Sequence, residues 1–389
     1  MFSKESVIGI IGSGAMGSGI AQVAATAGHS VIVVDNNQAA LDRAAANLKS
    51  TLAKLVEKQK ISTEKAAGIV SSIRFVADKQ TLSVCSLIIE AIVENPDVKK
   101  SVFRELETIT SPSCVLATNT SSLSITSIAS ACKDPGRVLG IHFFNPAPLM
   151  PLVEIIPGIA SKSEIVNACR DLINSWGKTT VIAKDTPGFI VNRVARPFYS
   201  EALRIYEEGI ADMATIDWAM KEIGGFRMGP FELMDMIGHD VNYVVTETVW
   251  KELYFDPRFK PALSQKRLVE AGFLGKKSGR GFYDYSEGAQ TPLPDTDKTK
   301  ATKIFRRILV MLINEAADTC YLNIATRADI DLAMTKGVNY PKGLLQWADE
   351  IGLDDVLEGL NSLRDFYEED RYRVSPLLKH LHASKKKFF

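Results

Sequence analysis

The sequence VIGIIGSGAMG, residues 7–17, decides the fold of the first part of this 389-residue chain. It reads as a short apolar strand that runs into a glycine-rich turn, and a helical pattern follows over residues 18–26. Gly12 permits a tight turn, Gly14 lets the backbone approach a pyrophosphate, and Gly17 lets the helix pack closely on the strand. The free N–H groups of the helix N-terminus favour phosphate binding. The residues predicted to contact a dinucleotide here are Gly12, Gly14, Ala15, Met16 and Gly17.

A second apolar run, residues 31–34, ends in Asp35, which lies 18 positions beyond Gly17. A carboxylate at this point accepts hydrogen bonds from an adenosine ribose but repels a 2′-phosphate. Asn36 and Asn37 follow it, and neither can neutralise such a phosphate. The sequence therefore predicts NAD rather than NADP as cofactor. The alternative is a glycine turn in an α/β domain that binds no nucleotide.

The pattern beyond Asp35 continues as alternating helix and strand. Residues 36–60 have leucines at helical spacing, which predicts an amphipathic helix. Its lysines, including Lys54 and Lys58, form either a solvated face or a contact with phosphate groups. Further apolar runs predict buried strands at residues 87–93, 115–118, 138–144 and 152–156. We therefore expect an α/β Rossmann-type domain that binds its ligand at the carboxyl ends of the strands.

Polar residues follow three of these predicted strands. Glu94 and Lys99 come after the first, the stretch 119–122 (Asn-Thr-Ser-Ser) after the second, and Asn145 after the third. Such residues are candidates for the nicotinamide side of the cleft. Ordinary loops and helix caps are the alternative interpretation.

His142 is the histidine that best fits a catalytic role. Of the five histidines, it is the one that lies at a strand end in the predicted cleft. Oxidation of an alcohol needs a group that removes the hydroxyl proton, and imidazole titrates in the right range. Glu154 lies in the next apolar run and is the nearest carboxylate that could orient the ring. From the residues alone, a buried structural histidine remains the alternative.

These motifs together resemble the L-3-hydroxyacyl-CoA dehydrogenases. The resemblance covers the glycine turn with Asp35 and five further strings in the same order. They are EAIVEN (90–95), NTSSL (119–123), HFFNP (142–146), VEII (153–156) and DTPGFIVNR (185–193).

The resemblance implies that His142 is the general base, that Glu154 orients it, and that Ser121 and Asn192 hold the 3-oxygen of an acyl-CoA substrate. It also implies NAD contacts, and it places Lys54 or Lys58 near coenzyme A. The residues with implied NAD contacts are Asp35, Glu94, Lys99, Ser121, Asn145 and Lys277. We expect no metal ion in this site.

The second half of the chain has helical patterns, including residues 191–208 and 214–223. Part of it repeats at a constant offset of 114 residues, for example Glu201 with Glu315 and Asp217 with Asp331. This predicts an all-α domain in two tandem copies. The expected domains are 1–185 (NAD binding), 186–286 (first helical copy), 287–300 (linker) and 301–389 (second copy). In single-copy relatives this helical domain mediates dimerisation, so we expect either a homodimer or a monomer with an internal pseudo-dimer.

Composition limits the other classes of function. The chain has 46 basic and 46 acidic side chains, so no overall field attracts nucleic acid or an anionic membrane. No apolar run approaches the length of a membrane span. The five scattered cysteines argue against a disulfide framework or a zinc site. Together with an apolar strand that begins almost at Met1, they predict a cytoplasmic location.

We therefore expect an enzyme that interconverts (3S)-3-hydroxyacyl-CoA and 3-oxoacyl-CoA. A short chain such as 3-hydroxybutyryl-CoA is expected, in fatty-acid metabolism, β-oxidation or butyrate metabolism. One alternative is a sugar-acid dehydrogenase of the L-gulonate type. Another is a crystallin-like structural protein that binds NAD without turnover.

Overall fold

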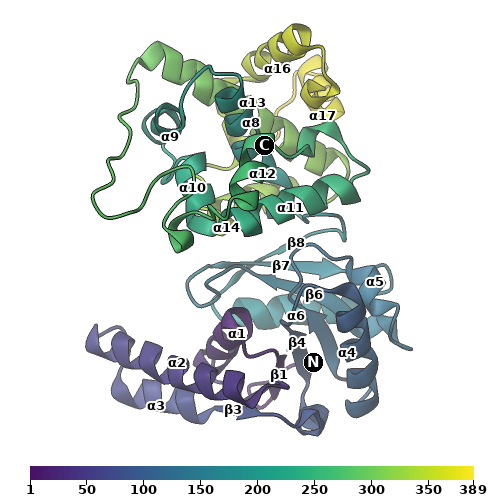
Figure 1. The fold of residues 1–389 in the computed structure, drawn as a ribbon. Helices are drawn as coiled ribbons and strands as arrows, with labels where there is room; N and C mark the ends of the chain where they lie inside the picture. The colour runs from purple at the N-terminus through teal and green to yellow at the C-terminus, as the bar shows by residue number, and fades with distance from the viewer. The chain divides into compact units, whose positions relative to one another are not determined.

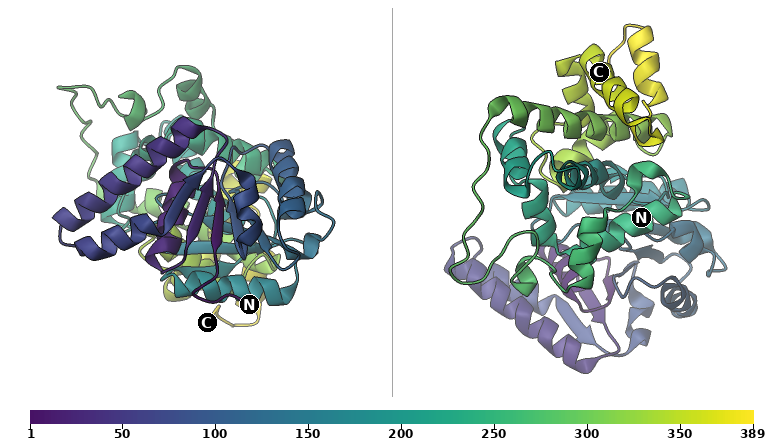
Figure 2. Two further views of the ribbon diagram at one scale, coloured as in Figure 1. Left: turned by 90° about the horizontal axis from the view of Figure 1, so that it is seen from below. Right: turned by 45° about the horizontal axis from the view of Figure 1, so that its top comes forward.

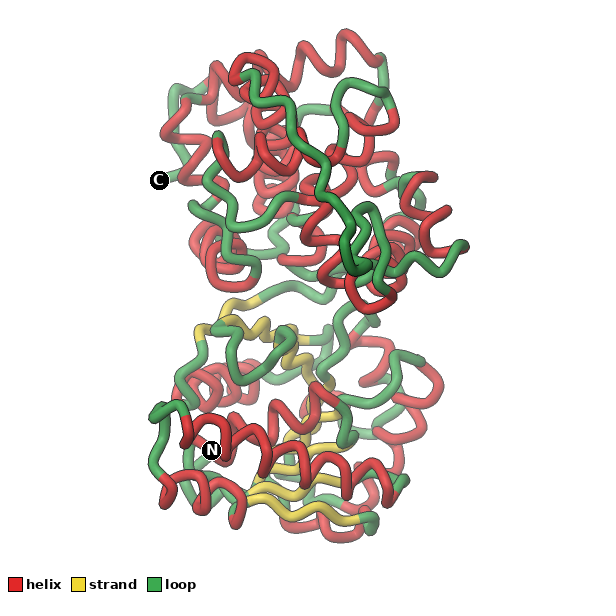
Figure 3. The backbone as a smooth tube through the Cα atoms, turned by 60° about the vertical axis from the view of Figure 1, so that its left-hand side comes forward, coloured by secondary structure: helices red, strands yellow, loops and turns green.

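The computed structural model describes residues 1–389, which form two compact units, Met1–Thr186 and Pro187–Phe389. All strands lie in the first unit, and the second is built from helices and loops (Figures 1 and 3). The chain therefore consists of a Rossmann-like domain followed by an all-α region. No helix combines the length and the apolar character that crossing a membrane requires.

The first unit is built on an eight-stranded sheet with the order β3-β2-β1-β4-β5-β6-β7-β8. All neighbouring strands are parallel except β6 and β7, which are antiparallel. The direction of strand order changes between β1 and β4, and such a switch point forms a ligand crevice at the strands' carboxyl ends. The strands are β1 (Ile8–Ile11), β2 (Val31–Val34), β3 (Ile73–Val76), β4 (Leu87–Glu90), β5 (Val115–Thr118), β6 (Val138–Phe143), β7 (Leu152–Pro157) and β8 (Thr179–Ile182).

Helices cover both faces of this sheet. Alternate residues of one strand enter different cores: Ile10 packs on one side of the sheet and Ile11 on the other. The first core includes residues of α1 (Ala15–Thr26), α2 (Gln38–Glu57), α3 (Thr63–Ser71) and α6 (Ser163–Ser175). The second core includes residues of η1 (Lys79–Val84), α4 (Pro96–Ile109) and α5 (Ile125–Ala129). Figure 2 shows the long helix α2 beside α3 in purple.

Two predicted boundaries in this unit were too wide. The strand predicted at 87–93 ends at Glu90, because the Glu90 carboxylate accepts a hydrogen bond from the Ile92 N–H and the chain turns there. The helix predicted at 36–60 is α2, and it begins after Asn37, whose side chain caps it through the Ala40 N–H.

The second unit begins with α7 (Val191–Val194) and α8 (Arg196–Glu207). The helical pattern predicted over 191–208 is divided into α7 and α8 at Ala195, two residues before Pro197, whose nitrogen carries no N–H to donate. The first copy continues with α9 (Met213–Glu222), α10 (Pro230–Ile237), α11 (His239–Glu252), η3 (Pro257–Phe259), α12 (Leu263–Glu270) and η4 (Lys276–Ser278). The second copy comprises α13 (Lys298–Tyr321), α14 (Arg327–Gly337), α15 (Leu344–Ile351), α16 (Leu353–Tyr367), η5 (Asp370–Tyr372) and α17 (Pro376–Ala383).

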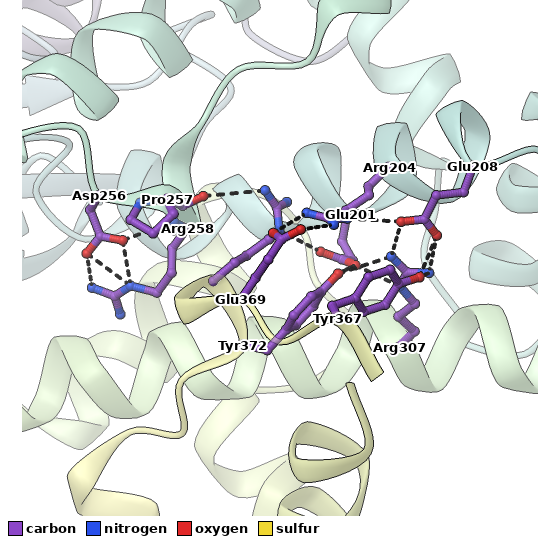
Figure 4. A network of polar contacts seen from close by, with 11 residues as sticks. Glu201, Arg204, Glu208, Asp256, Pro257, Arg258, Arg307, Tyr367, Glu369 and Tyr372 are labelled. Atoms are coloured by element: carbon purple, nitrogen blue, oxygen red, sulfur yellow. Dashed lines mark hydrogen bonds and ion pairs between the residues drawn. The ribbon is translucent and has the colours of Figure 1, made fainter. Parts of the chain in front are cut away.

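Buried ion pairs join the two helical copies. Arg307 Nε lies 2.7 Å from Glu201 Oε1, and Arg371 Nε lies 3.2 Å from Glu201 Oε2. The Tyr372 hydroxyl donates to the same carboxylate at 2.8 Å. Figure 4 shows Arg307 and Tyr372 near Glu201, with Glu208 beside Arg307. Burial raises the pKa of Glu201, but the two arginines outweigh it and hold the pKa below its usual value.

Candidate active site

The glycine turn is shaped to receive a phosphate. Gly12 has φ of +100°, and a Cβ there would lie 2.5 Å from the Ala91 carbonyl oxygen. A Cβ on Gly17 would overlap the Gly12 carbonyl oxygen. Gly14 differs, since a Cβ there would meet nothing within 4 Å. The tight turn therefore requires glycine at positions 12 and 17. Gly14 instead leaves open space in front of the N-terminus of α1.

Asp35 at the end of β2 is fixed beside this turn. Its Oδ2 accepts hydrogen bonds from both the backbone N–H and the hydroxyl of Ser13, each at 2.8 Å. The Asn37 N–H donates to Oδ1 at 3.0 Å. Partial burial raises the pKa of Asp35, but these hydrogen bonds outweigh it and lower the pKa overall. The carboxylate is therefore charged and held in place, as a ribose-binding acid must be.

Two cavities meet at Gly14 and Asp35. One, of about 390 Å³, is lined mainly by apolar residues, among them Val34, Ile92 and Val98. A mainly apolar cavity with an acid in its lining fits an adenosine. The other, of about 580 Å³, lies between α1 and α2. Its polar lining residues are Ser13, Ser18, Gln22, Asp35, Arg43, Asn47 and Thr51.

Two cations at these cavities were not predicted from the sequence. Arg43 lines the larger cavity and Lys79 the smaller one. Arg43 is five residues after the first residue of α2. A basic residue this close to the end of the second predicted strand was the signal that could have identified it. Lys54 and Lys58 are exposed near the C-terminal end of α2 and do not line either cavity.

Glu94 links the ends of β4 and β5. Its Oε1 accepts hydrogen bonds from the Thr120 hydroxyl at 2.5 Å and the Ser121 N–H at 3.0 Å. Its Oε2 lies 3.2 Å from Lys99 Nζ. Burial raises the pKa of Glu94, but Lys99 and these donors outweigh it and lower the pKa. Glu94 is therefore a charged carboxylate, and it holds the loop that carries Ser121.

Lys99 is almost completely buried. Its Nζ lies 2.6 Å from Glu90 Oε1, so it bridges Glu90 and Glu94, and its exposed fraction is 1%. The Thr118 hydroxyl satisfies the second oxygen of Glu90. The structure thus gives Lys99 two carboxylate partners, and its contact with NAD stays a prediction.

His142 and Glu154 are paired across the β6–β7 hairpin. They stand opposite each other in the antiparallel register, and His142 Nδ1 lies 2.7 Å from Glu154 Oε2. Both are buried, with exposed fractions of 5% and 0%. Because Glu154 accepts from Nδ1–H, the neutral ring presents Nε2 as its proton acceptor. This is the geometry of an oriented general base.

Asn119 and Asn145 follow the ends of β5 and β6. The Asn119 side chain accepts a hydrogen bond from the Phe143 N–H at 2.8 Å, which ties β5 to β6. Asn145 follows β6 and is exposed. Asn145, Glu94, Ser121 and His142 therefore lie at the carboxyl edge of the parallel strands, the edge that also carries the glycine turn.

The other predicted residues belong to the second unit. Asn192 lies on α7 and is half-buried. Lys277 lies in η4, where its Nζ is 2.5 Å from Asp240 Oδ1. Their roles toward substrate and NAD stay predictions.

The fold and the cradle at the glycine turn define a dehydrogenase that binds NAD. Residues 7–186 match the model of the 3-hydroxyacyl-CoA dehydrogenase NAD-binding domain. Residues 188–285 and 304–387 match the C-terminal domain of the same enzymes. The chain belongs to the 3-hydroxyacyl-CoA dehydrogenase family, and it is an NAD-dependent enzyme of that family.

Similar proteins fall into two lengths. The 3-hydroxyadipyl-CoA dehydrogenase of Escherichia coli K12 is 37% identical, and the match covers 97% of this chain and 98% of that protein. A solved structure of 3-hydroxybutyryl-CoA dehydrogenase from E. coli K12 has a TM-score of 0.93 at 36% identity, covering 98% of this chain and 100% of that one. The 3-hydroxybutyryl-CoA dehydrogenase of Clostridioides difficile is 41% identical over 99% of its length but 72% of this chain.

Proposed function

We propose that the enzyme interconverts short-chain (3S)-3-hydroxyacyl-CoA and 3-oxoacyl-CoA, with 3-hydroxybutyryl-CoA as one substrate. The observation that carries this proposal is the His142–Glu154 pair at the end of β6, on the sheet edge that holds the glycine turn. NAD, when bound, accepts a hydride from C3 of the substrate. His142 Nε2 takes the proton of the 3-hydroxyl group, so that the carbonyl forms. Glu154 holds the ring and stabilises its charged form.

Ser121 and Asn192 act on the 3-oxygen in this proposal. Their polar groups hold the oxygen and stabilise the charge that develops on it. The hydrogen bonds that Glu94 accepts from Thr120 and Ser121 support this role for Ser121, because they fix the backbone of its loop.

Coenzyme A is expected along α2. The larger cavity supports this placement, because Arg43 and Thr51 supply a cation and a hydroxyl to its lining. Lys54 and Lys58, further along the same helix, would meet the phosphate groups outside it. The neutral protein offers no general field, so these local cations are needed for a highly anionic substrate.

A dicarboxylic substrate is the second candidate. A relative that matches nearly the full chain is named for 3-hydroxyadipyl-CoA, which carries a second carboxylate at the end of its acyl chain. The buried Arg196, which has no carboxylate partner in this chain, favours this candidate.

We also propose that the enzyme is a monomer whose two helical copies form an internal pseudo-dimer, and that it works in the cytoplasm. The buried pairs on Glu201 and Glu315 support the first proposal, because they occupy the surface through which the copies meet. The five free cysteines support the second, since none is paired.

A substrate panel tests the function. The purified enzyme should oxidise NADH with acetoacetyl-CoA and reduce NAD with 3-hydroxybutyryl-CoA. L-Gulonate should give no turnover. Turnover of L-gulonate in place of the acyl-CoA would establish a sugar-acid dehydrogenase, and NADH binding without any turnover would establish a structural protein.

A further inference from the structure

Arg196 is the one buried arginine of this chain without an acidic partner. It begins α8, and 4% of its surface is exposed. Its Nη1 donates to the Thr246 hydroxyl at 3.0 Å, its Nε has no hydrogen-bond partner, and its guanidinium carbon lies 4.9 Å from the centre of the Tyr199 ring. The other buried arginines each pair with a carboxylate: Arg137 with Glu107, Arg193 with Glu315, Arg258 with Asp256 and Arg371 with Glu201.

An unpaired buried cation is unfavourable, because it loses its hydration without gaining a counter-ion. Burial lowers the pKa of Arg196 for the same reason, although arginine stays protonated at neutral pH. The hydroxyl of Tyr340, whose ring centre lies 5.7 Å from that of Phe198 two residues after Arg196, also has no partner. Two unsatisfied donors therefore lie in one buried region, and an acceptor with a negative charge would satisfy both.

The helical fold itself does not require this charge. The position equivalent to Arg196 in the second copy, at the offset of 114 residues, is Val310 in α13. Val310 is buried, with 2% of its surface exposed. An apolar side chain thus packs well at this point of the helix, so Arg196 has a purpose that the second copy lacks.

Arg196 follows Asn192, the residue proposed to hold the substrate's 3-oxygen, by four positions. Ala195 between α7 and α8 keeps the right-handed helical conformation, so Asn192 and Arg196 are one turn apart. Residues four apart on a helix share a face and are separated by about 6 Å along its axis. Helical side chains lean toward the N-terminus, so the Arg196 side chain leans toward the turn of Asn192. Asn192 is half-buried, whereas Arg196 is buried.

We propose that Arg196 binds the terminal carboxylate of a dicarboxylic 3-hydroxyacyl-CoA, with the Tyr340 hydroxyl as a second donor. In a six-carbon substrate, 3-hydroxyadipyl-CoA, three carbon–carbon bonds separate C3 from the terminal carboxylate carbon. Five bonds therefore separate the 3-oxygen from a terminal carboxylate oxygen, and this extended span of about 6 Å is close to the spacing of Asn192 and Arg196 along the helix. This inference rests on the proposed function, because it takes Asn192 as the residue that holds the 3-oxygen.

Kinetics with two substrates test the assignment. The ratio of kcat/KM for 3-hydroxyadipyl-CoA to that for 3-hydroxybutyryl-CoA is measured for the wild type, Arg196→Val and Arg196→Lys. Removing one partner of a buried charge pair costs about 2–5 kcal/mol, so Arg196→Val should lower the ratio by about 30-fold or more. Arg196→Lys keeps the charge and should retain part of the preference. The matched control is Arg227→Val, which changes an exposed arginine of the same unit and should leave the ratio unchanged.

A structural role for Arg196 would give a different pattern. Arg196→Val would then lower kcat/KM for both substrates by the same factor, and that result would overturn the proposal. The variant should fold, since Val310 occupies the equivalent site, and thermal unfolding checks this.

Binding of inert analogues separates this inference from the proposed function. Adipyl-CoA and butyryl-CoA lack the 3-hydroxyl group and cannot react, so their Kd values report binding alone. Adipyl-CoA should bind the wild type more tightly than butyryl-CoA, and Arg196→Val should remove the difference. Equal binding by the wild type overturns the inference. If neither hydroxyacyl-CoA is oxidised but the analogues still differ, the proposed function fails while the carboxylate site stands.

Discussion

Arg193 and Arg307 occupy equivalent positions of the two helical copies, and each donates its Nε to the glutamate of the other copy at 2.7 Å. Arg193 reaches Glu315, and Arg307 reaches Glu201. Each copy therefore contacts the other through the same pair of positions, which is the rule of a two-fold isologous interface. Here both halves of that interface belong to one chain.

Breaking one of these pairs should destabilise the fold. Glu201→Gln leaves the buried Arg371 without its carboxylate, while the half-buried Arg307 keeps Glu208, and we expect a loss of about 3–5 kcal/mol in the free energy of unfolding. Glu315→Gln should have a similar effect on the opposite pair. Urea unfolding followed by circular dichroism measures both. The control is Asp365→Asn, which breaks the exposed ion pair of Asp365 with Arg364. Its expected change in the free energy of unfolding is less than about 1 kcal/mol.

His142→Ala should remove the proton acceptor and lower kcat by about 100- to 10,000-fold. NADH affinity, measured by fluorescence titration, should be retained. Glu154→Gln keeps the size of the side chain but removes the charge that faces Nδ1, so kcat should fall while KM changes little. Full activity of His142→Ala would contradict the assignment of the base.

Asp35→Ala should weaken NADH binding, since a hydrogen bond to a charged group contributes about 1.5–3 kcal/mol. The expected rise in Kd is therefore about 10- to 150-fold. The affinity for NADPH should rise or stay level in the same variant, because the carboxylate that repels a 2′-phosphate is gone. Ser13→Ala, which removes one of the donors that hold Asp35, should have a smaller effect in the same direction.

Lys99→Met should destabilise the first unit strongly. It leaves the buried carboxylate of Glu90 and the exposed carboxylate of Glu94 without their shared cation, and the loss at Glu90 is expected to cost about 3–5 kcal/mol. Lys60→Met, an exposed lysine, serves as the control and should change the free energy of unfolding by less than about 0.5 kcal/mol. Unchanged stability of Lys99→Met would show that the ion pair adds little to the fold.

The buried thiols should be unreactive in the folded protein. Burial raises the pKa of Cys85, Cys114 and Cys169 to about 12 and that of Cys132 to about 11. At pH 8 a group with a pKa of about 12 has a thiolate fraction on the order of 1 in 10,000, and the thiolate is the reactive form. A thiol reagent should therefore label the half-buried Cys320 first, and all five cysteines after unfolding. Rapid labelling of the native protein at several sites would contradict the burial of these thiols.

The parts of this molecule that could be predicted from sequence depend on neighbours close in the chain. The glycine turn and Asp35 belong to one βαβ unit, and the pairing of His142 with Glu154 follows from a hairpin between adjacent strands. In both cases the residues that decide the structure lie within a few dozen positions of each other, and local pattern rules apply.

The parts that were missed depend on distant neighbours. Arg193 and Glu315 are separated by 122 positions, and no local pattern connects them. Arg43 was not predicted because it lines the larger cavity only through the packing of α2 on α1. Arg196 looked like an ordinary helix residue, since the absence of a partner can be recognised only when all of its neighbours are known.

The fusion of the two helical copies in one chain has an evolutionary consequence. In a symmetric homodimer every mutation appears in both subunits, so a change that helps one site must be tolerated at its symmetry mate. When both copies are encoded in one gene, a mutation appears once. Arg196 in one copy and Val310 in the other are such a difference. The duplication therefore lets one copy acquire new specificity while the other keeps the packing that holds the pair together.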